Sequence, residues 1–162
     1  MIEVEHDDNI LRTFILFTQT ARGVLKYTDC QLYREAHLSI VQFIVLQVLN
    51  SIGNAMTPSE IAEWTQTERH NITQLVKRMK KEGLVTVERD SNDGRAKNII
   101  LTNKGREVLD QAMPVAREII DHVMLSLGEN EAILLEKTLQ VLRRNAQNGL
   151  EYVAKFPQPQ SG

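Results

Sequence analysis

The hydrophobic period of this chain changes at Gly83, and this change limits the folds that the chain can adopt. Before Gly83, four apolar residues recur at spacings of three and four, which is typical of one face of a helix over about 67–82. They are Ile72, Leu75, Val76 and Met79. After Gly83, the β-branched run Leu84–Arg89 and the run Lys97–Leu101 predict two strands that are joined by a turn cluster. The sequence therefore predicts a helix that leads directly into a β-hairpin.

Two more helices are expected just before this unit. Residues 39–51 are apolar nearly all round, with Ser39 as a candidate N-cap and Gly53 beyond the end, which predicts a helix in the middle of a core. The run Thr57–Glu60 forms a capping box with proline at the first helical position, and the short helix that it begins ends near Thr65. The resulting order of helix, short helix, helix and hairpin is that of a winged helix-turn-helix.

Further helices flank this region on both sides. Helical spacing predicts a helix over 9–28, a connector over 29–38, a helix over 103–127 that bends at Pro114, and a last helix over 130–154. These helices carry apolar seams, and a two-fold partner is the commonest way to bury such seams. The expected fold class is mainly α with a small antiparallel β wing. We expect a single domain, 1–162, with dimerisation helices at 9–38 and 103–154, a winged helix-turn-helix at 39–102, and a loose tail at 155–162.

The charge of the chain is unevenly distributed. The whole sequence has 19 Lys+Arg and 21 Asp+Glu, a net charge of −2, which by itself argues against nucleic-acid binding. Residues 69–106, however, contain ten Lys/Arg and four Asp/Glu, a net +6, so that the remainder carries −8. A basic centre between acidic ends is typical of an interaction surface.

The helix expected over 67–82 carries polar side chains on the face opposite its apolar stripe. Asn, Gln, Thr, Arg and Lys can bond base edges or phosphates, and in this motif the first half of the helix enters the major groove. Arg95 would project from the turn into the minor groove, and Asp93 would pair with Arg89 or Arg95 and hold the loop. The candidate DNA-binding residues are Arg69, His70, Asn71, Thr73, Gln74, Lys77, Arg78, Lys81, Arg89, Asp93, Arg95 and Lys97.

Three segments together resemble the MarR family of bacterial transcription regulators. Residues 65–85 resemble the recognition-helix pattern Leu-Val-x-Arg-Leu-x-x-x-Gly-Leu-Val, Arg89–Lys97 the wing pattern Arg-Asp-x-x-Asp-x-Arg, and Leu101–Gly105 the Leu-Thr-x-x-Gly entry to the next helix. The helix order matches over about 9–150. The resemblance implies a homodimer with interlocked first and last helices, which reads a palindromic operator in double-stranded DNA. By position, it implies major-groove contacts from Asn71, Thr73, Gln74, Lys77 and Arg78, and a minor-groove contact from Arg95.

The expected function is therefore that of a sequence-specific DNA-binding repressor. In many members of the resembled family a small molecule binds between the dimerisation and winged regions and weakens DNA binding. Six residues are candidates to line such an effector pocket, each with ordinary packing as its alternative role: Phe14, Phe17, Tyr33, His37, Phe43 and Trp64. We expect no cofactor, and a location in the cytoplasm at the nucleoid, since the apolar run at Ile40–Leu49 is shorter than a membrane span of roughly 20 residues.

Other functions remain as alternatives. A regulator of the same fold that responds to metal or redox state would use Cys30, for metal together with Glu35, His37 and His122. A helical adaptor that binds only protein would leave the basic segment unexplained. An enzyme is not expected, because the chain has no Gly-rich phosphate loop, no Gly-x-Ser-x-Gly motif and no metal-ligand spacing.

Overall fold

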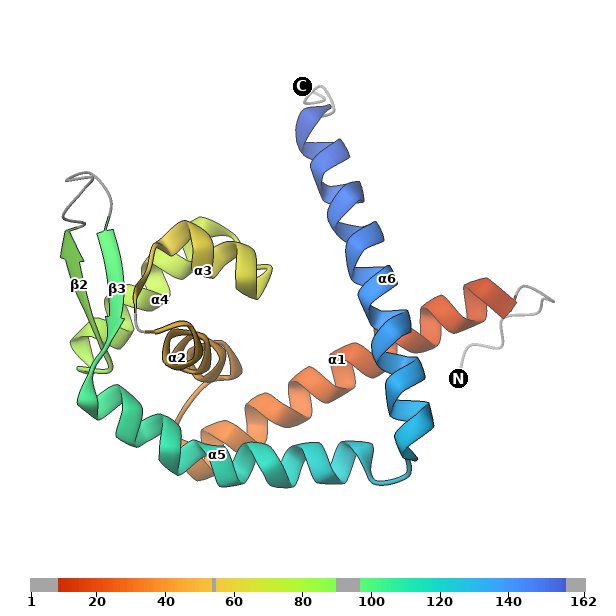
Figure 1. The fold of residues 1–162 in the computed structure, drawn as a ribbon, viewed down its shortest axis with the longest axis horizontal. Helices are drawn as coiled ribbons and strands as arrows, with labels where there is room; N and C mark the ends of the chain where they lie inside the picture. The colour runs from red at the N-terminus through yellow and green to blue at the C-terminus, as the bar shows by residue number, and fades with distance from the viewer. Residues whose placement is uncertain (1–8, 54, 90–96, 157–162) are drawn as a thin grey trace. The chain divides into compact units, whose positions relative to one another are not determined.

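The structure is a computed structural model that describes residues 9–53, 55–89 and 97–156. The chain divides into two compact units, Met1–Val123 and Met124–Gly162, and each is described by itself. The described elements are α1 (Asn9–Ala36), α2 (Ile40–Ile52), β1 (Ala55–Met56), α3 (Pro58–Thr65), α4 (Arg69–Lys81), β2 (Val85–Arg89), β3 (Lys97–Leu101), α5 (Asn103–Met124) and α6 (Glu129–Lys155). Figure 1 shows their order along the chain. The expected fold class, mainly α with a small antiparallel sheet, is confirmed.

Helix α1 is longer than expected. The expected connector over 29–38 is wrong, because α1 continues through Ala36 and turns only at His37, whose φ is 54°. Leu32 is fully buried in the core and holds this last part of the helix in place. The Asp29 Oδ1 atom accepts a hydrogen bond of 2.8 Å from the Ile40 N–H, so α1 also binds the start of the next helix.

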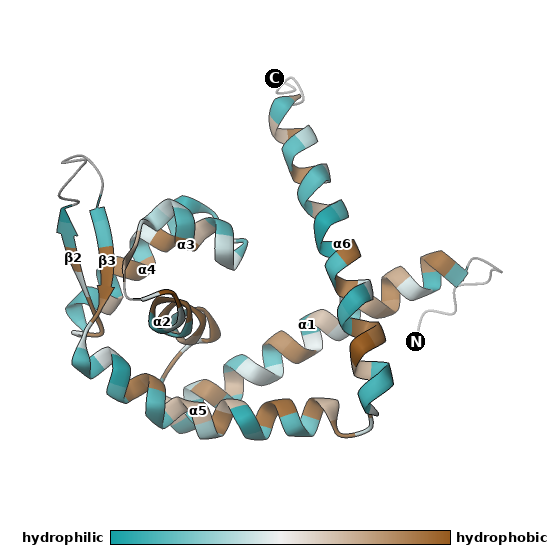
Figure 2. Ribbon diagram, in the orientation of Figure 1, coloured by the Kyte–Doolittle hydropathy of each residue, from teal (hydrophilic) through white to brown (hydrophobic). Residues whose placement is uncertain are grey.

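Helix α2 is the central helix of the first unit, as expected, and Figure 2 shows that most of its length is hydrophobic. Ser39 caps its start: the Ser39 Oγ atom accepts from the Gln42 N–H at 3.2 Å, and the Ser39 N–H donates to Gln42 Oε1 at 2.9 Å. Gly53 ends it with a φ of 90°, which favours glycine. The helix buries four side chains, Val45, Leu46, Val48 and Leu49, in the core.

The expected capping box at the start of α3 is confirmed. Thr57 accepts from the Glu60 N–H at 3.3 Å, and the Glu60 carboxylate accepts from the Thr57 N–H at 2.7 Å. The bond from the Thr57 N–H, and after it the 2.9 Å bond that the Thr57 hydroxyl donates to Glu60 Oε2, lower the pKa of Glu60 because both favour its charged form. The box fixes where α3 begins, and α3 in turn packs against α4.

The hairpin of β2 and β3 is confirmed, and it belongs to a sheet with the strand order β1-β3-β2. In the β2–β3 pair, Val85 lies opposite Leu101 and Val87 opposite Ile99, which turns one side of the hairpin toward the core. The third strand, β1, was not expected, because its two residues are too few to show an alternating pattern.

Helix α5 continues through Pro114 and ends at Met124 rather than at 127, and the expected bend at Pro114 stays a prediction. The second unit consists mainly of α6, in which the structure describes no buried residue. The expected seam of this helix, Leu135, Leu139, Leu142, Ala146 and Leu150, is exposed along its whole length. Most of the expected loose tail, 157–162, lies outside the described residues, while Lys155 belongs to α6. The division into dimerisation helices and a winged region stays a prediction.

No single helix in the described ranges has the length and hydropathy needed to cross a membrane. Helices α1 and α2 meet that test only as a pair, and they are bent by 79° at their junction.

Candidate nucleic-acid interface

Helix α4 separates its apolar and polar side chains onto two faces. Its four apolar residues, Ile72, Leu75, Val76 and Met79, are buried in the core, as their spacing predicted. The other face is exposed and carries amides, a hydroxyl, an imidazole and five cationic groups. These exposed residues are Arg69, His70, Asn71, Thr73, Gln74, Lys77, Arg78, Lys80 and Lys81. The structure therefore places all eight helix candidates on one accessible surface, and it adds Lys80, which was not among the candidates predicted from the sequence.

The structure describes no ion pair that neutralises the positive charge of this surface. None of the five cationic residues of α4 forms an ion pair with a residue that the structure describes. Three of them, Arg78, Lys80 and Lys81, lie in the last turn, where the partial negative charge of the helix end favours cations. Unpaired guanidinium and ammonium groups on a rigid helix are suited to bind phosphate oxygens.

The hydroxyl group of Thr73 already donates a hydrogen bond within α4. Its hydroxyl donates to the Arg69 carbonyl oxygen at 2.9 Å, within the same helix. A hydroxyl has a single hydrogen, so the side chain can offer a base only an oxygen lone pair or its methyl group. Contact between this methyl group and a thymine methyl is one base contact that the geometry allows.

A compact junction fixes the end of α4 to the start of α5. Gly83 has a φ of 77°, which ends the helix and leads the chain into β2. The Thr102 Oγ1 atom lies 2.7 Å from the Gly83 carbonyl oxygen and 3.0 Å from that of Leu84, and it accepts from the Gly105 N–H at 2.9 Å. The Leu-Thr-x-x-Gly motif thus has a structural purpose: it positions the helix and the hairpin relative to α5.

The open end of the β2–β3 hairpin also carries positive charge. Arg89 and Lys97 lie directly opposite each other, and both are exposed. Like charges in opposite positions repel each other, and a bound anion removes that repulsion. The next part of the hairpin, 90–96, lies outside the described residues, and so do the expected groove contact of Arg95 and the expected ion pair of Asp93.

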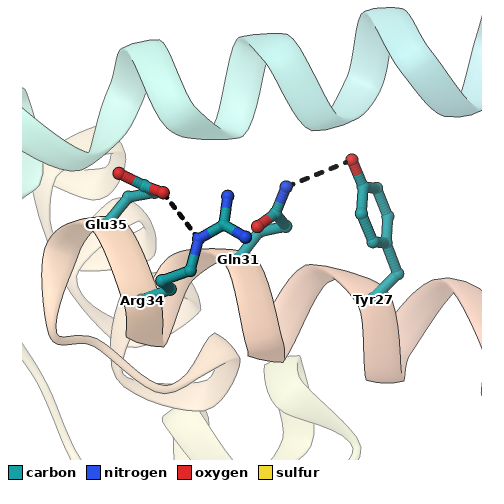
Figure 3. A network of polar contacts seen from close by, with 4 residues as sticks. All are labelled: Tyr27, Gln31, Arg34 and Glu35. Atoms are coloured by element: carbon teal, nitrogen blue, oxygen red, sulfur yellow. Dashed lines mark hydrogen bonds and ion pairs between the residues drawn. The ribbon is translucent and has the colours of Figure 1, made fainter.

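A cavity of about 460 Å³ lies between α1 and α5 in the first unit. Its lining combines charged, hydrogen-bonding and apolar side chains: Tyr27, Gln31, Arg34, Glu35, Pro114, Val115, Glu118, Ile119 and His122. Figure 3 shows the α1 side, where Gln31 Nε2 donates to the Tyr27 hydroxyl at 3.5 Å and Arg34 Nε donates to Glu35 Oε1 at 2.6 Å. The Tyr27 and His122 rings lie with centroids 5.6 Å apart.

None of the six residues predicted for an effector pocket lines this cavity. Tyr33 and His37 contact each other edge to face, with ring centroids 6.4 Å apart, and Phe43 packs against the core. The remaining three, Phe14, Phe17 and Trp64, are exposed. The sequence did contain a pattern that could have indicated the cavity residues. Tyr27 and Gln31 are four residues apart, as are Glu118 and His122, and this spacing places each pair on one face of a helix. This pattern was missed because the first helix was expected to end at residue 28.

The structure does not bring together the residues of the metal-binding alternative. Among the described residues, no three His, Cys, Asp or Glu side chains are close enough to hold a metal ion, and Cys30, Glu35, His37 and His122 form no such group. Cys30 itself is exposed.

An exposed basic helix on a winged helix-turn-helix defines a class of protein, the DNA-binding transcription regulators. A family model described as MarR family matches residues 38–96. The chain is 29% identical to the HTH-type transcriptional repressor IacR of Pseudomonas putida over 129 residues, which cover 80% of this chain and 72% of that protein.

Two solved structures extend the comparison over most of the chain. The regulator MosR of M. tuberculosis, solved in complex with DNA, is 30% identical, with a TM-score of 0.71 and coverage of 83% of this chain and 95% of that chain. The organohalide-sensing regulator RdhR, solved with bound 2,4-dichlorophenol, shares the fold, with a TM-score of 0.73, 23% identity and coverage of 90% and 89%. The chain belongs to the MarR family, a family of transcriptional regulators and not of enzymes.

Proposed function

We propose that the protein is a homodimeric repressor that binds a palindromic operator through α4 and is released from it by a small molecule. The observation that carries this proposal is the exposed face of α4. Amide and cationic side chains lie on this face, and the opposite face of the same helix is apolar and buried in the core. Base-edge and phosphate contacts need these groups on a rigid helix. The repressor name of IacR and the DNA complex of MosR support the same assignment.

The exposed apolar side chains of α6 support the homodimer. This helix has 27 residues, and the structure describes none of them as buried. In water, a helix owes most of its stability to the packing of an apolar face, and the structure describes no buried residue in α6 that would provide it. The first turns of α1 expose further large apolar side chains, Ile10, Leu11, Phe14, Leu16 and Phe17. A second copy of the chain offers matching surfaces of the same composition.

A two-fold dimer would account for a palindromic operator. It would present two copies of α4 to one face of the DNA, about 34 Å apart, which is one turn of the double helix. Each α4 would then read one half-site.

The cavity between α1 and α5 is the site that we propose for the effector. Its charged lining, Arg34, Glu35 and Glu118, sums to −1, which disfavours an anionic ligand. Val115 and Ile119 offer apolar contact, and Tyr27 and His122 offer ring faces and hydrogen bonds. A neutral aromatic molecule with a hydroxyl group fits this chemistry, and RdhR holds such a molecule, a chlorinated phenol.

The effector proposal predicts that neutral phenols release the protein from its operator at lower concentrations than benzoates of the same size. Release would be followed by fluorescence anisotropy of labelled operator DNA. Replacing Ile119 with tryptophan, which fills the cavity, should abolish release by phenols while operator binding without ligand remains. Equal release of this variant and the unmodified protein would contradict the site.

The reading role of α4 predicts different effects for Asn71→Ala and Lys77→Ala. Loss of a base-reading amide should cost about 1–3 kcal/mol of operator affinity and leave binding to random DNA unchanged. Loss of a phosphate-binding ammonium should weaken binding to all sequences about equally and reduce the salt slope by about one. Lys26→Ala, at an exposed position of α1, is the matched control for the charge change. Titrations over a range of salt concentrations separate these effects, and two variants with the same profile would refute the division of roles.

A further inference from the structure

Glu82 forms hydrogen bonds to two other helices at the point where α4 ends. Its backbone carbonyl accepts from the Lys104 Nζ atom of α5 at 2.7 Å. Its side-chain Oε2 atom accepts from the Nε2 atom of Gln42 in α2 at 2.9 Å. Glu82 is also the C-cap residue: its own N–H donates to the Arg78 carbonyl oxygen at 2.9 Å, and the Gly83 N–H donates to that of Lys80 at 3.0 Å. The C-terminal end of α4 is thus held by directional bonds from both sides.

Gln42 uses both halves of its amide group. Its Oε1 atom accepts from the Ser39 N–H at 2.9 Å and completes the capping box of α2, while its Nε2 atom donates to Glu82. The same turn of α2 donates a hydrogen bond to α1, from the Ile40 N–H to the Asp29 carboxylate. One turn of α2 therefore connects α1, which lines the cavity, to the end of α4.

Among the described residues, no side-chain hydrogen bond from another helix holds the N-terminal end of α4, although Ile72 packs there in the core. Its N-cap residue, Glu68, makes no side-chain capping bond. The helix is about 18 Å long, so a tilt of roughly 6° about its C-terminal end moves its first turn by about 2 Å. Hydrogen bonds to base edges tolerate only a few tenths of an ångström, so such a tilt would break them. The apolar packing of Ile72, Leu75, Val76 and Met79 opposes this tilt, and the directional bonds at Glu82 add to that resistance.

We propose that the Gln42–Glu82 hydrogen bond sets the orientation of α4 for base contacts. Both residues are positioning residues that do not themselves touch DNA, and the proposal rests on the reading role of α4. An exposed bond of this kind contributes little to the stability of the fold. Its effect is therefore expected on operator affinity and not on the melting temperature.

Two substitutions of Glu82 give a charge-matched test. Glu82→Gln and Glu82→Ala remove the same charge, but glutamine keeps an oxygen that can accept from Gln42. We expect Glu82→Ala to bind the operator about tenfold more weakly than Glu82→Gln, with equal affinity for random DNA and equal melting temperatures. Equal operator affinities of the two variants would overturn the proposal. Failure of the unmodified protein to prefer any sequence would instead overturn the reading role itself.

A rescue experiment tests the same bond from the side of α2. Gln42→Glu keeps the acceptor for the Ser39 N–H but places a carboxylate opposite Glu82, so operator affinity should fall about tenfold. Adding Glu82→Gln restores the bond with its direction reversed and returns the net charge to its original value, so affinity should recover to within about twofold. Gln111→Glu, at an exposed position of α5, is the charge control. A double variant that folds but remains as weak as Gln42→Glu would overturn the proposal.

Discussion

Replacing Gly105 with alanine is expected to lower the free energy of unfolding by about 3 kcal/mol. A Cβ atom at this position would overlap the Leu84 carbonyl oxygen, and it would lie 2.8 Å from Leu101 Cδ1. The Leu84 oxygen is backbone and is held by the Thr102 N–H at 3.2 Å, so it cannot move aside as a flexible side chain could. Relief requires that the start of α5 shift away from β2.

This loss of stability is opposite in sign to the usual effect of a Gly→Ala substitution inside a helix. Alanine in place of glycine inside a helix normally stabilises a protein by roughly 0.5–1 kcal/mol. Gly23→Ala in α1, where the added carbon would meet no described atom within 4 Å beyond its chain neighbours and the adjacent helix backbone, is the matched control and should be neutral or stabilising. Urea unfolding followed by circular dichroism would compare the three proteins. A Gly105→Ala variant as stable as the unmodified chain would show that the junction yields without cost.

Replacing Leu139 with glutamate is expected to dissociate the proposed dimer. Operator affinity should then fall on the order of 10²–10⁴-fold. The reason is that a monomer binds only one half-site, whereas a dimer gains affinity from binding the second half-site within the same complex. The charge would lie in the middle of the exposed seam of α6, where the partner surface would have to desolvate it.

The control for this substitution lies on the same helix. Asn148→Glu introduces the same charge at an exposed position nine residues further along, which is the opposite side of α6. It should leave both the dimer and its affinity unchanged. Analytical ultracentrifugation and operator titrations would test both variants. A Leu139→Glu protein that remains dimeric, or that binds as tightly as the control, would contradict the assignment of the seam.

The sequence predicted the parts of the fold that depend on residues close together in the chain. The two faces of α4 follow from the spacing of Ile72, Leu75, Val76 and Met79. The start of α3 follows from the capping box at Thr57. Each of these patterns lies within a few helical turns, so it can be read without knowledge of the surrounding structure.

Features that depend on distant residues were not predicted. Polar residues such as Asp29 and Gln31 interrupt the apolar pattern of α1, and its last turns are held by burial of Leu32 and by the bond to Ile40. Gln42 and Glu82 are forty residues apart, and no local pattern links them. The two sides of the cavity likewise come from α1 and α5, so its lining could be recognised only in the folded chain.

Selection of preferred sequences from a random pool of double-stranded DNA tests the central claim most directly, namely that two copies of α4 read a two-fold operator. The account predicts enrichment of inverted repeats whose half-site centres are about 10–10.5 base pairs apart. It also predicts that Asn71→Ala loses the preference at one symmetric pair of positions and keeps the spacing. Enrichment of a single unrepeated site, or of no sequence at all, would contradict it.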